Sequence, residues 1–121
     1  MELVFVGIGG ALGSLARYKL GKIVTEKSNT TFPIGTFLIN ITGAILLGIV
    51  SALDAGRNIY LLLGDGFLGA YTTFSTFMYE GFHLFQENEE MNAFVYVLGS
   101  LFLGLIGYIS GVELGKLMKI I

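Results

Sequence analysis

Long stretches without a charged residue limit what this chain can fold into more than any other feature. Residues 33–53 give 21 consecutive positions without a charge, and residues 91–112 give 22. A helix needs about 20 mostly apolar residues to cross the hydrocarbon of a bilayer. With 54% hydrophobic residues, 13% charged residues and a mean hydropathy of +0.77, the 121-residue chain is too apolar for an ordinary soluble domain. We therefore expect an all-α membrane protein that makes several passes through the lipid bilayer.

The length suits a single domain, 1–121, with four transmembrane helices. We expect these helices at about 3–24, 33–53, 59–85 and 91–115. Arg17 is the deepest basic residue of the first helix and reaches either a water-filled vestibule or the interface. Asp65 is either an intramembrane carboxylate or an interfacial one, and the sequence leaves both open. Glu80 to Glu90 reads as an acidic, solvated loop after the third helix.

Glycine spacing predicts close contacts between helices. Gly9 and Gly13 form a small-xxx-small face in the first helix, and Gly107, Gly111 and Gly115 form a second ridge in the fourth. Small residues at this spacing let two helix backbones approach closely in a membrane. We interpret both faces as packing surfaces.

The third hydrophobic segment contains a polar stretch that a plain membrane helix would not carry. Residues 64–77 read GDGFLGAYTTFSTF, in which glycines lead into hydroxyl residues with Phe74 and Phe77 set among them. Irregular backbone at membrane depth is tolerated only where it is buried in protein or lines a polar cavity. The sequence therefore predicts a broken third helix, interrupted from Gly69 to Thr73, that forms an ion site.

Polar side chains in the other helices can complete that site. Asn40 lies mid-span with Thr36 on the same face, and Tyr96 shares a face with Ser100 in the fourth helix. The alternative for Asn40 is a plain hydrogen bond to a neighbouring helix. Phe74 and Phe77, spaced three apart, are also compatible with ordinary packing.

Two kinds of ion fit these groups. Hydroxyls, an amide and the positive edges of phenyl rings bind an anion without a fixed cation that would hold it too tightly, which favours a small, strongly hydrogen-bonding anion. Carbonyl oxygens freed at the break are hard ligands suited to Na⁺.

The basic residues hardly select an orientation in the membrane. Four spans place Arg57, Lys116 and Lys119 on one side, and Arg17, Lys19, Lys22 and Lys27 on the other. The excess of Lys and Arg on the cytoplasmic side sets orientation, and three against four is almost a tie. A chain that inserts both ways can pair with an inverted copy of itself, so we expect an antiparallel, dual-topology homodimer.

Several function classes are excluded by composition. The chain has no cysteine and a single histidine, His83, which removes thiolate chemistry and leaves no set of zinc ligands. A net charge of −2 without a basic run argues against a nucleic-acid partner. No nucleophile and base pair is visible, so we do not expect an enzyme.

Three blocks of sequence resemble the signature blocks of the Fluc (CrcB) fluoride channels. They are GGALGSLARY at residues 9–18, GTFLINITGAILLG at 35–48 and GFLGAYTTFSTF at 66–77, and the likeness covers nearly the whole chain. The resemblance implies a dual-topology antiparallel homodimer in a prokaryotic inner membrane, with two pores that let fluoride leave the cytoplasm passively.

The resemblance also implies residue roles. The anion pathway would contain the phenylalanines, the amide between them, the hydroxyls beside them and the polar track of the fourth helix, namely Phe74, Phe77, Asn40, Ser75, Thr76, Tyr96 and Ser100. Gly69 and Thr72 would offer backbone carbonyls, doubled by the dimer, to a structural Na⁺ at its centre. Gly104 departs from the family pattern where many members have a further hydroxyl, and Ala70 departs where glycine is common.

Two other functions are compatible with parts of the sequence. A proton-coupled exporter of the small multidrug-resistance type is also a four-helix inverted dimer, but it needs a titratable carboxylate at midplane, for which only Asp65 is available. A scaffold subunit without a pathway would leave the polar cluster unexplained.

Overall fold

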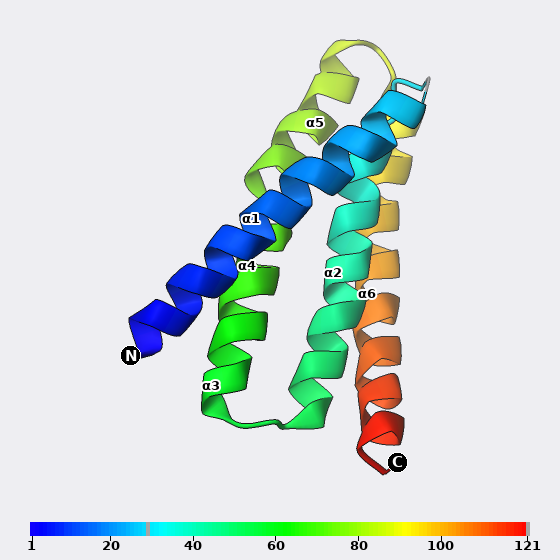
Figure 1. Cartoon of the computed structure of the whole chain (residues 1–121). Helices are drawn as coiled ribbons and strands as arrows, with labels where there is room; N and C mark the ends of the chain where they lie inside the picture. Colours follow the sequence, from blue (N-terminus) through cyan, green and yellow to red (C-terminus); the bar gives the residue numbers. More distant parts are fainter. Residues whose placement is uncertain (29, 121) are drawn as a thin grey trace.

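The chain folds into helices, and the N-terminal helix crosses the others obliquely (Figure 1). The computed structural model describes residues 1–28 and 30–120, and within these residues no strand is formed. Helix α1 spans Glu2–Lys27, α2 spans Ile34–Leu53 and α6 spans Glu90–Ile120. In the described part of the chain, these 3 helices are long and apolar enough to cross a membrane. The prediction of an all-α membrane protein is confirmed.

The third hydrophobic segment is divided into several pieces. It consists of α3 (Arg57–Tyr60), the π-helix η1 (Leu61–Leu68), α4 (Gly69–Tyr71) and α5 (Ser75–Gln86). Gly69 is helical, with φ −61° and ψ −35°, whereas Thr72 is extended, with φ −81° and ψ 160°. The interruption therefore begins at Thr72 and not at Gly69, where the sequence placed it. Any residue adopts the extended conformation of Thr72, so the break does not depend on a glycine.

Glycines bring the long helices into close contact, as their spacing predicts. A Cβ atom at Gly111 would overlap the backbone of Ile45 in α2, and one at Gly115 would lie 2.8 Å from the carbonyl oxygen of Ile49. On the other side of the molecule, a Cβ at Gly9 or Gly13 would overlap the backbone of η1. Since these contacts involve backbone, no side-chain rotation can relieve them, and the two glycine faces set the spacing of α6 on α2 and of α1 on η1.

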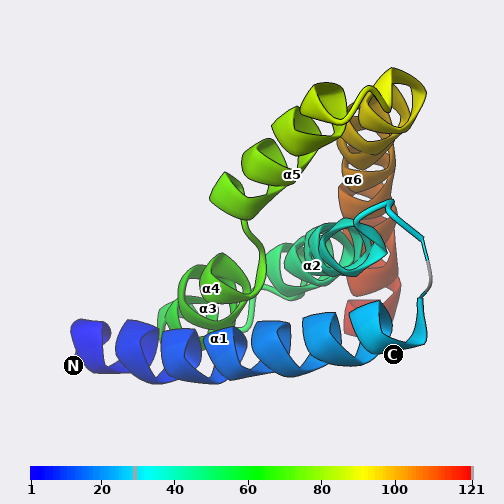
Figure 2. The same ribbon diagram turned by 90° about the horizontal axis from the view of Figure 1, so that it is seen from above.

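The pieces of the broken segment pack on different helices, η1 and α4 on α1 and α5 on α6. Figure 1 shows both termini at the same end of the molecule as the turn between α2 and α3. Seen from above in Figure 2, α1 runs across α3 and α4, while α5 leans away from α4 toward α6. At the N-terminal end, Arg57 donates to both carboxylate oxygens of Glu2 at 2.9 and 3.1 Å and so links α3 to α1. The change of direction between α4 and α5 is the structural consequence of the break.

Candidate functional site

A pocket of about 260 Å³ lies where the break meets α2 and α6. Four of the predicted anion-pathway residues line it, one from α2, two from the broken segment and one from α6. The full lining is Asn40, Thr72, Thr73, Phe74, Phe77, Ser100 and Leu101. No charged side chain is among these residues, all of which belong to the described part of the chain. The fold thus gathers uncharged donors and aromatic rings around one space.

Asn40 is joined to the break on both sides of its amide group. Its Nδ2 donates to the carbonyl oxygen of Thr73 at 2.9 Å, and its Oδ1 accepts from the N–H of Thr73 at 2.9 Å. Asn40 therefore forms hydrogen bonds to a neighbouring segment of the chain, as the alternative interpretation of this residue predicts. An asparagine amide carries two N–H groups. Because only one is used on Thr73, the second remains available for a further partner in the pockets that Asn40 lines.

The two phenylalanines occupy different environments although they are neighbours. Their ring centroids lie 6.2 Å apart. Phe77 is 6% exposed and packs 5.2 Å from the ring of Tyr96, whereas Phe74 is 74% exposed. Phe77 therefore forms the inner wall of the pocket, and Phe74 forms its open rim.

The two residues of α6 that the sequence predicts for the pathway differ in the hydrogen bonding of their hydroxyl groups. The Tyr96 ring is fully buried and its hydroxyl lies 3.4 Å from Oε1 of Glu80. Ser100 Oγ is buried and has no hydrogen-bond partner among the described residues. A buried hydroxyl without a partner carries a free-energy penalty unless a water or ligand satisfies it. Ser100 is the polar group of this pocket most in need of a partner.

Ser75 and Thr76 do not reach the pocket. Both are exposed at the start of α5, and the N–H of Thr76 donates to Thr73 Oγ1 at 3.3 Å. Their position follows from the extended backbone at Thr72, which turns the first residues of α5 outward.

A second, larger groove of about 440 Å³ runs along the other side of the break. Asp65, Gly69 and Thr72 line it together with Asn40. The N–H of Thr73, which would close the helical hydrogen bond to the Gly69 carbonyl, donates to Asn40 instead. The last carbonyls of a helix have no intrahelical partner and carry partial negative charge. The C-terminal end of α4 therefore offers backbone oxygens to this groove.

These oxygens suit one class of metal ion. Neutral carbonyls are hard ligands, which fits an alkali-metal cation such as Na⁺. Within residues 1–28 and 30–120, no group of three or more His, Cys, Asp or Glu side chains could hold a transition metal. The donor set at Gly69 and Thr72 is therefore compatible with Na⁺, although two carbonyls from one chain make only part of a coordination shell.

Sequence reasoning missed two features of the site. Glu80, which lies in the expected third helix but was expected to be solvated, is half-buried beside Tyr96. Its spacing of three from Phe77 on one helix face was the available signal. The second feature is a contact between Thr42 and Tyr71, for which the sequence carried no signal because the two residues lie on different helices, 29 positions apart.

The fold and the site together define an integral membrane protein in which long helices pack against an interrupted one beside an uncharged polar pocket. Comparison with known proteins agrees with this class. A family described as "CrcB-like protein, Camphor Resistance (CrcB)" matches residues 4–112. This chain belongs to that family.

Curated relatives in several bacteria are similar over nearly their whole length. A protein of Clostridium acetobutylicum named "Fluoride-specific ion channel FluC 2" is 52% identical over 117 residues, which is 97% of this chain and 100% of the relative. One of Moorella thermoacetica with the same name is 45% identical, over 88% of this chain and 89% of the relative. A "Fluoride-specific ion channel FluC 1" of Carboxydothermus hydrogenoformans is 38% identical, over 98% and 97%. The family is one of ion channels and not of enzymes, as the sequence predicts.

Proposed function

We propose that this chain forms a passive, fluoride-selective channel that lets cytoplasmic fluoride leave a bacterial cell across the inner membrane. The observation that carries the proposal is the uncharged pocket in which Asn40 and Phe77 meet the unpartnered hydroxyl of Ser100. The names of the relatives support fluoride as the permeating ion. The pocket supplies the chemistry that such an ion needs.

Fluoride is small and strongly hydrated, so a pathway must replace its water with other donors. In this pocket the donors are the Ser100 hydroxyl, the remaining N–H of Asn40 and the ring edges of Phe74 and Phe77. None of them is charged, so each stabilises the anion without trapping it. Conduction requires binding that is favourable enough for entry and weak enough for exit. Ser75, Thr76 and Tyr96 then belong to the approaches of the pathway on either side of the pocket.

We further propose that two copies associate in opposite orientations, which gives two pathways per dimer. The groove beside the break exposes Asn40, Asp65 and Thr72 along its side. Polar backbone and side chains facing lipid would be unsatisfied, and a second copy can cover them. The near-tie of three against four basic residues at the two ends favours insertion both ways.

Within this dimer, we assign a structural sodium site to the carbonyls of Gly69 and Thr72. An inverted second copy would double the set of two oxygens around the axis that relates the copies. A bound Na⁺ supplies positive charge that neutralises the facing carbonyl dipoles. The residues of this chain hold those carbonyls at the end of α4, because Asn40 diverts the N–H of Thr73 away from Gly69.

Flux from liposomes tests the function directly. Purified protein in fluoride-loaded vesicles should release fluoride when a potassium ionophore carries the compensating charge, and should release no chloride in the same assay. Without the ionophore, fluoride release should stop, since passive channel flux is electrogenic. Chloride release at a comparable rate would contradict the proposal.

The proton-coupled exporter makes a different prediction in the same vesicles. Such a carrier depends on a titratable carboxylate, and Asp65 is the candidate. Fluoride flux should survive Asp65→Asn if the chain is a channel. Uptake of an organic cation driven by a proton gradient, abolished by Asp65→Asn, would instead establish a carrier.

Labelling in cells tests dual topology. The chain contains no cysteine, so Asn88→Cys introduces one thiol at the turn between α5 and α6. A membrane-impermeant thiol reagent should label part of the protein from outside and the rest only after the membrane is opened. Labelling entirely from one side would exclude the antiparallel dimer. It would not affect the test of the channel by fluoride flux.

A further inference from the structure

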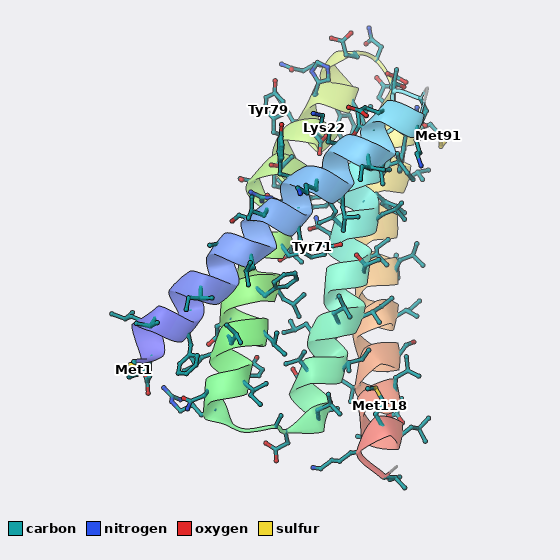
Figure 3. All side chains as sticks on the ribbon, in the orientation of Figure 1. Met1, Lys22, Tyr71, Tyr79, Met91 and Met118 are labelled. Atoms are coloured by element: carbon teal, nitrogen blue, oxygen red, sulfur yellow. The ribbon has the colours of Figure 1, made fainter. Side chains whose placement is uncertain are left out.

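Tyr71, the last residue of α4, is held in the protein interior by its ring and its hydroxyl. It is 5% exposed and belongs to a core cluster with Ile39 and Leu68. Its ring stacks on that of Phe67, with centroids 5.9 Å apart. Its hydroxyl lies 3.0 Å from Oγ1 of Thr42 in α2. Figure 3 labels Tyr71 between α4 and α2.

The direction of this hydrogen bond follows from the surroundings of Thr42. Thr42 Oγ1 donates to the carbonyl oxygen of Leu38 at 2.7 Å. Thr42 Oγ1 also lies 3.1 Å from the carbonyl oxygen of Ile39, and a threonine hydroxyl has one hydrogen to donate. With that hydrogen on a carbonyl of α2, Thr42 Oγ1 acts as the acceptor for the Tyr71 hydroxyl. The result is a relay from Tyr71 through Thr42 to the backbone of α2.

Helix α2 therefore forms hydrogen bonds to the residues on both sides of Thr72. Tyr71 is bound through Thr42, and Thr73 is bound through Asn40. Gly43 allows this approach, because a Cβ there would lie 3.3 Å from the Tyr71 ring and would overlap Cγ2 of Thr72. The carbonyl of Thr72 lies between the two attachments, and that of Gly69 lies in the helical turn that Tyr71 ends.

We propose that Tyr71 and Thr42 are positioning residues that fix the Gly69 and Thr72 carbonyls in the geometry that a sodium ion requires. This inference rests on the sodium site of the proposed function. The two residues do not touch the ion, and they act through the backbone at the end of α4, directly before Thr72. Loss of their hydrogen bond lets the end of α4 move and weakens sodium binding, while the anion pocket keeps its walls.

Tyr71→Phe is the first test, because it removes one oxygen and keeps the stacked ring. Thr42 still donates to Leu38, so no buried donor is left without a partner. The measured quantity is the melting temperature of the purified protein across a sodium series, with N-methylglucamine keeping the ionic strength constant. The sodium concentration for half-maximal stabilisation should rise roughly fivefold, as expected for the loss of one ordinary hydrogen bond. The selectivity for fluoride over chloride should not change.

Thr42 variants separate positioning from a general loss of stability. Thr42→Val leaves the Tyr71 hydroxyl buried without an acceptor and should weaken sodium binding more than Tyr71→Phe does. Thr42→Ser keeps the hydroxyl, so the sodium concentration for half-maximal stabilisation should equal that of the wild type. The double variant Tyr71→Phe/Thr42→Val should bind sodium better than Thr42→Val alone, because it no longer buries an unpaired Tyr71 hydroxyl. Tyr79→Phe, at a side chain that is 71% exposed, is the matched control and should change nothing.

Two failures can be told apart. If wild-type protein shows sodium-dependent stability and Tyr71→Phe has the same midpoint, the positioning role is wrong and the sodium site stands. If wild-type protein shows no sodium dependence, the sodium site and the positioning role are both wrong, and the fluoride flux of the wild type then tests the channel separately. A Thr42→Ser variant that behaves like Thr42→Val would also contradict the relay.

Discussion

Asn40 and Thr73 form a reciprocal pair of hydrogen bonds, each 2.9 Å long, across 33 positions of sequence. An amide side chain that pairs with both backbone groups of one residue mimics the contact between two strands. It satisfies the two groups that the interrupted helix would otherwise leave open in the membrane. The same contact frees the Gly69 carbonyl, so it connects the uncharged pocket lined by Ser100 to the groove on the other side of the break.

Asn40→Ala should destabilise the protein and impair the channel together. The change removes both hydrogen bonds to Thr73, so we expect the free energy of unfolding to fall by about 1–3 kcal/mol. Denaturation in detergent micelles measures this, and the liposome assay should show a large loss of fluoride flux. Asn58→Ala, at an exposed position in α3, is the control and should alter neither quantity. Unchanged stability in Asn40→Ala would show that the pair contributes nothing to the break.

Ser100→Ala should separate flux from stability. Ser100 Oγ has no partner within the described protein, so its removal costs no internal hydrogen bond and should change the free energy of unfolding by less than about 1 kcal/mol. Fluoride flux should fall several-fold, because the pocket loses its unsatisfied donor. Ser110→Ala, at an exposed position of the same helix, is the matched control. Normal flux in Ser100→Ala would remove this hydroxyl from the pathway.

Phe77→Ile should reduce the flux and leave the oligomeric state unchanged. The variant replaces the buried inner wall of the pocket with an aliphatic side chain, which lacks the positive ring edge that faces an anion. We expect fluoride flux to fall strongly while size-exclusion chromatography shows the same assembly as the wild type. Phe102→Ile, at a ring that is 65% exposed, should behave as wild type. A change of oligomeric state in Phe77→Ile would instead indicate a packing role.

Gly111→Val and Gly104→Ala should differ sharply although both add carbon to α6. At Gly111 the new side chain collides with the backbone of Ile45, and overpacking of this kind costs about 1–3 kcal/mol or more. At Gly104 a Cβ would meet nothing within 4 Å. Membrane expression and melting temperature should fall for the first variant and stay normal for the second. Equal stability of the two would contradict the packing of α6 on α2.

The long uncharged stretches alone determined the fold class, because a bilayer leaves an apolar segment of this length few options other than a helix. Glycine spacing likewise determined which faces pack closely, since only glycine at Gly111 lets α6 reach the backbone of α2. The resemblance of residues 66–77 to the fluoride channel family identified fluoride as the expected ion. The periodicity of hydrophobic residues did not. These properties are local or compositional, so a linear sequence carries them.

Only the tertiary structure decided where the helix breaks and which donors remain free. The sequence placed the start of the break at Gly69, where the backbone is flexible, but Gly69 stays helical and the chain departs at Thr72. The reason is that Asn40 and Thr42 on α2 hold Thr73 and Tyr71, and contacts between separate helices override the local freedom of a glycine. For the same reason Ser100 is left without a partner while Tyr96 reaches Glu80, a difference that two hydroxyls on one helix face could not reveal.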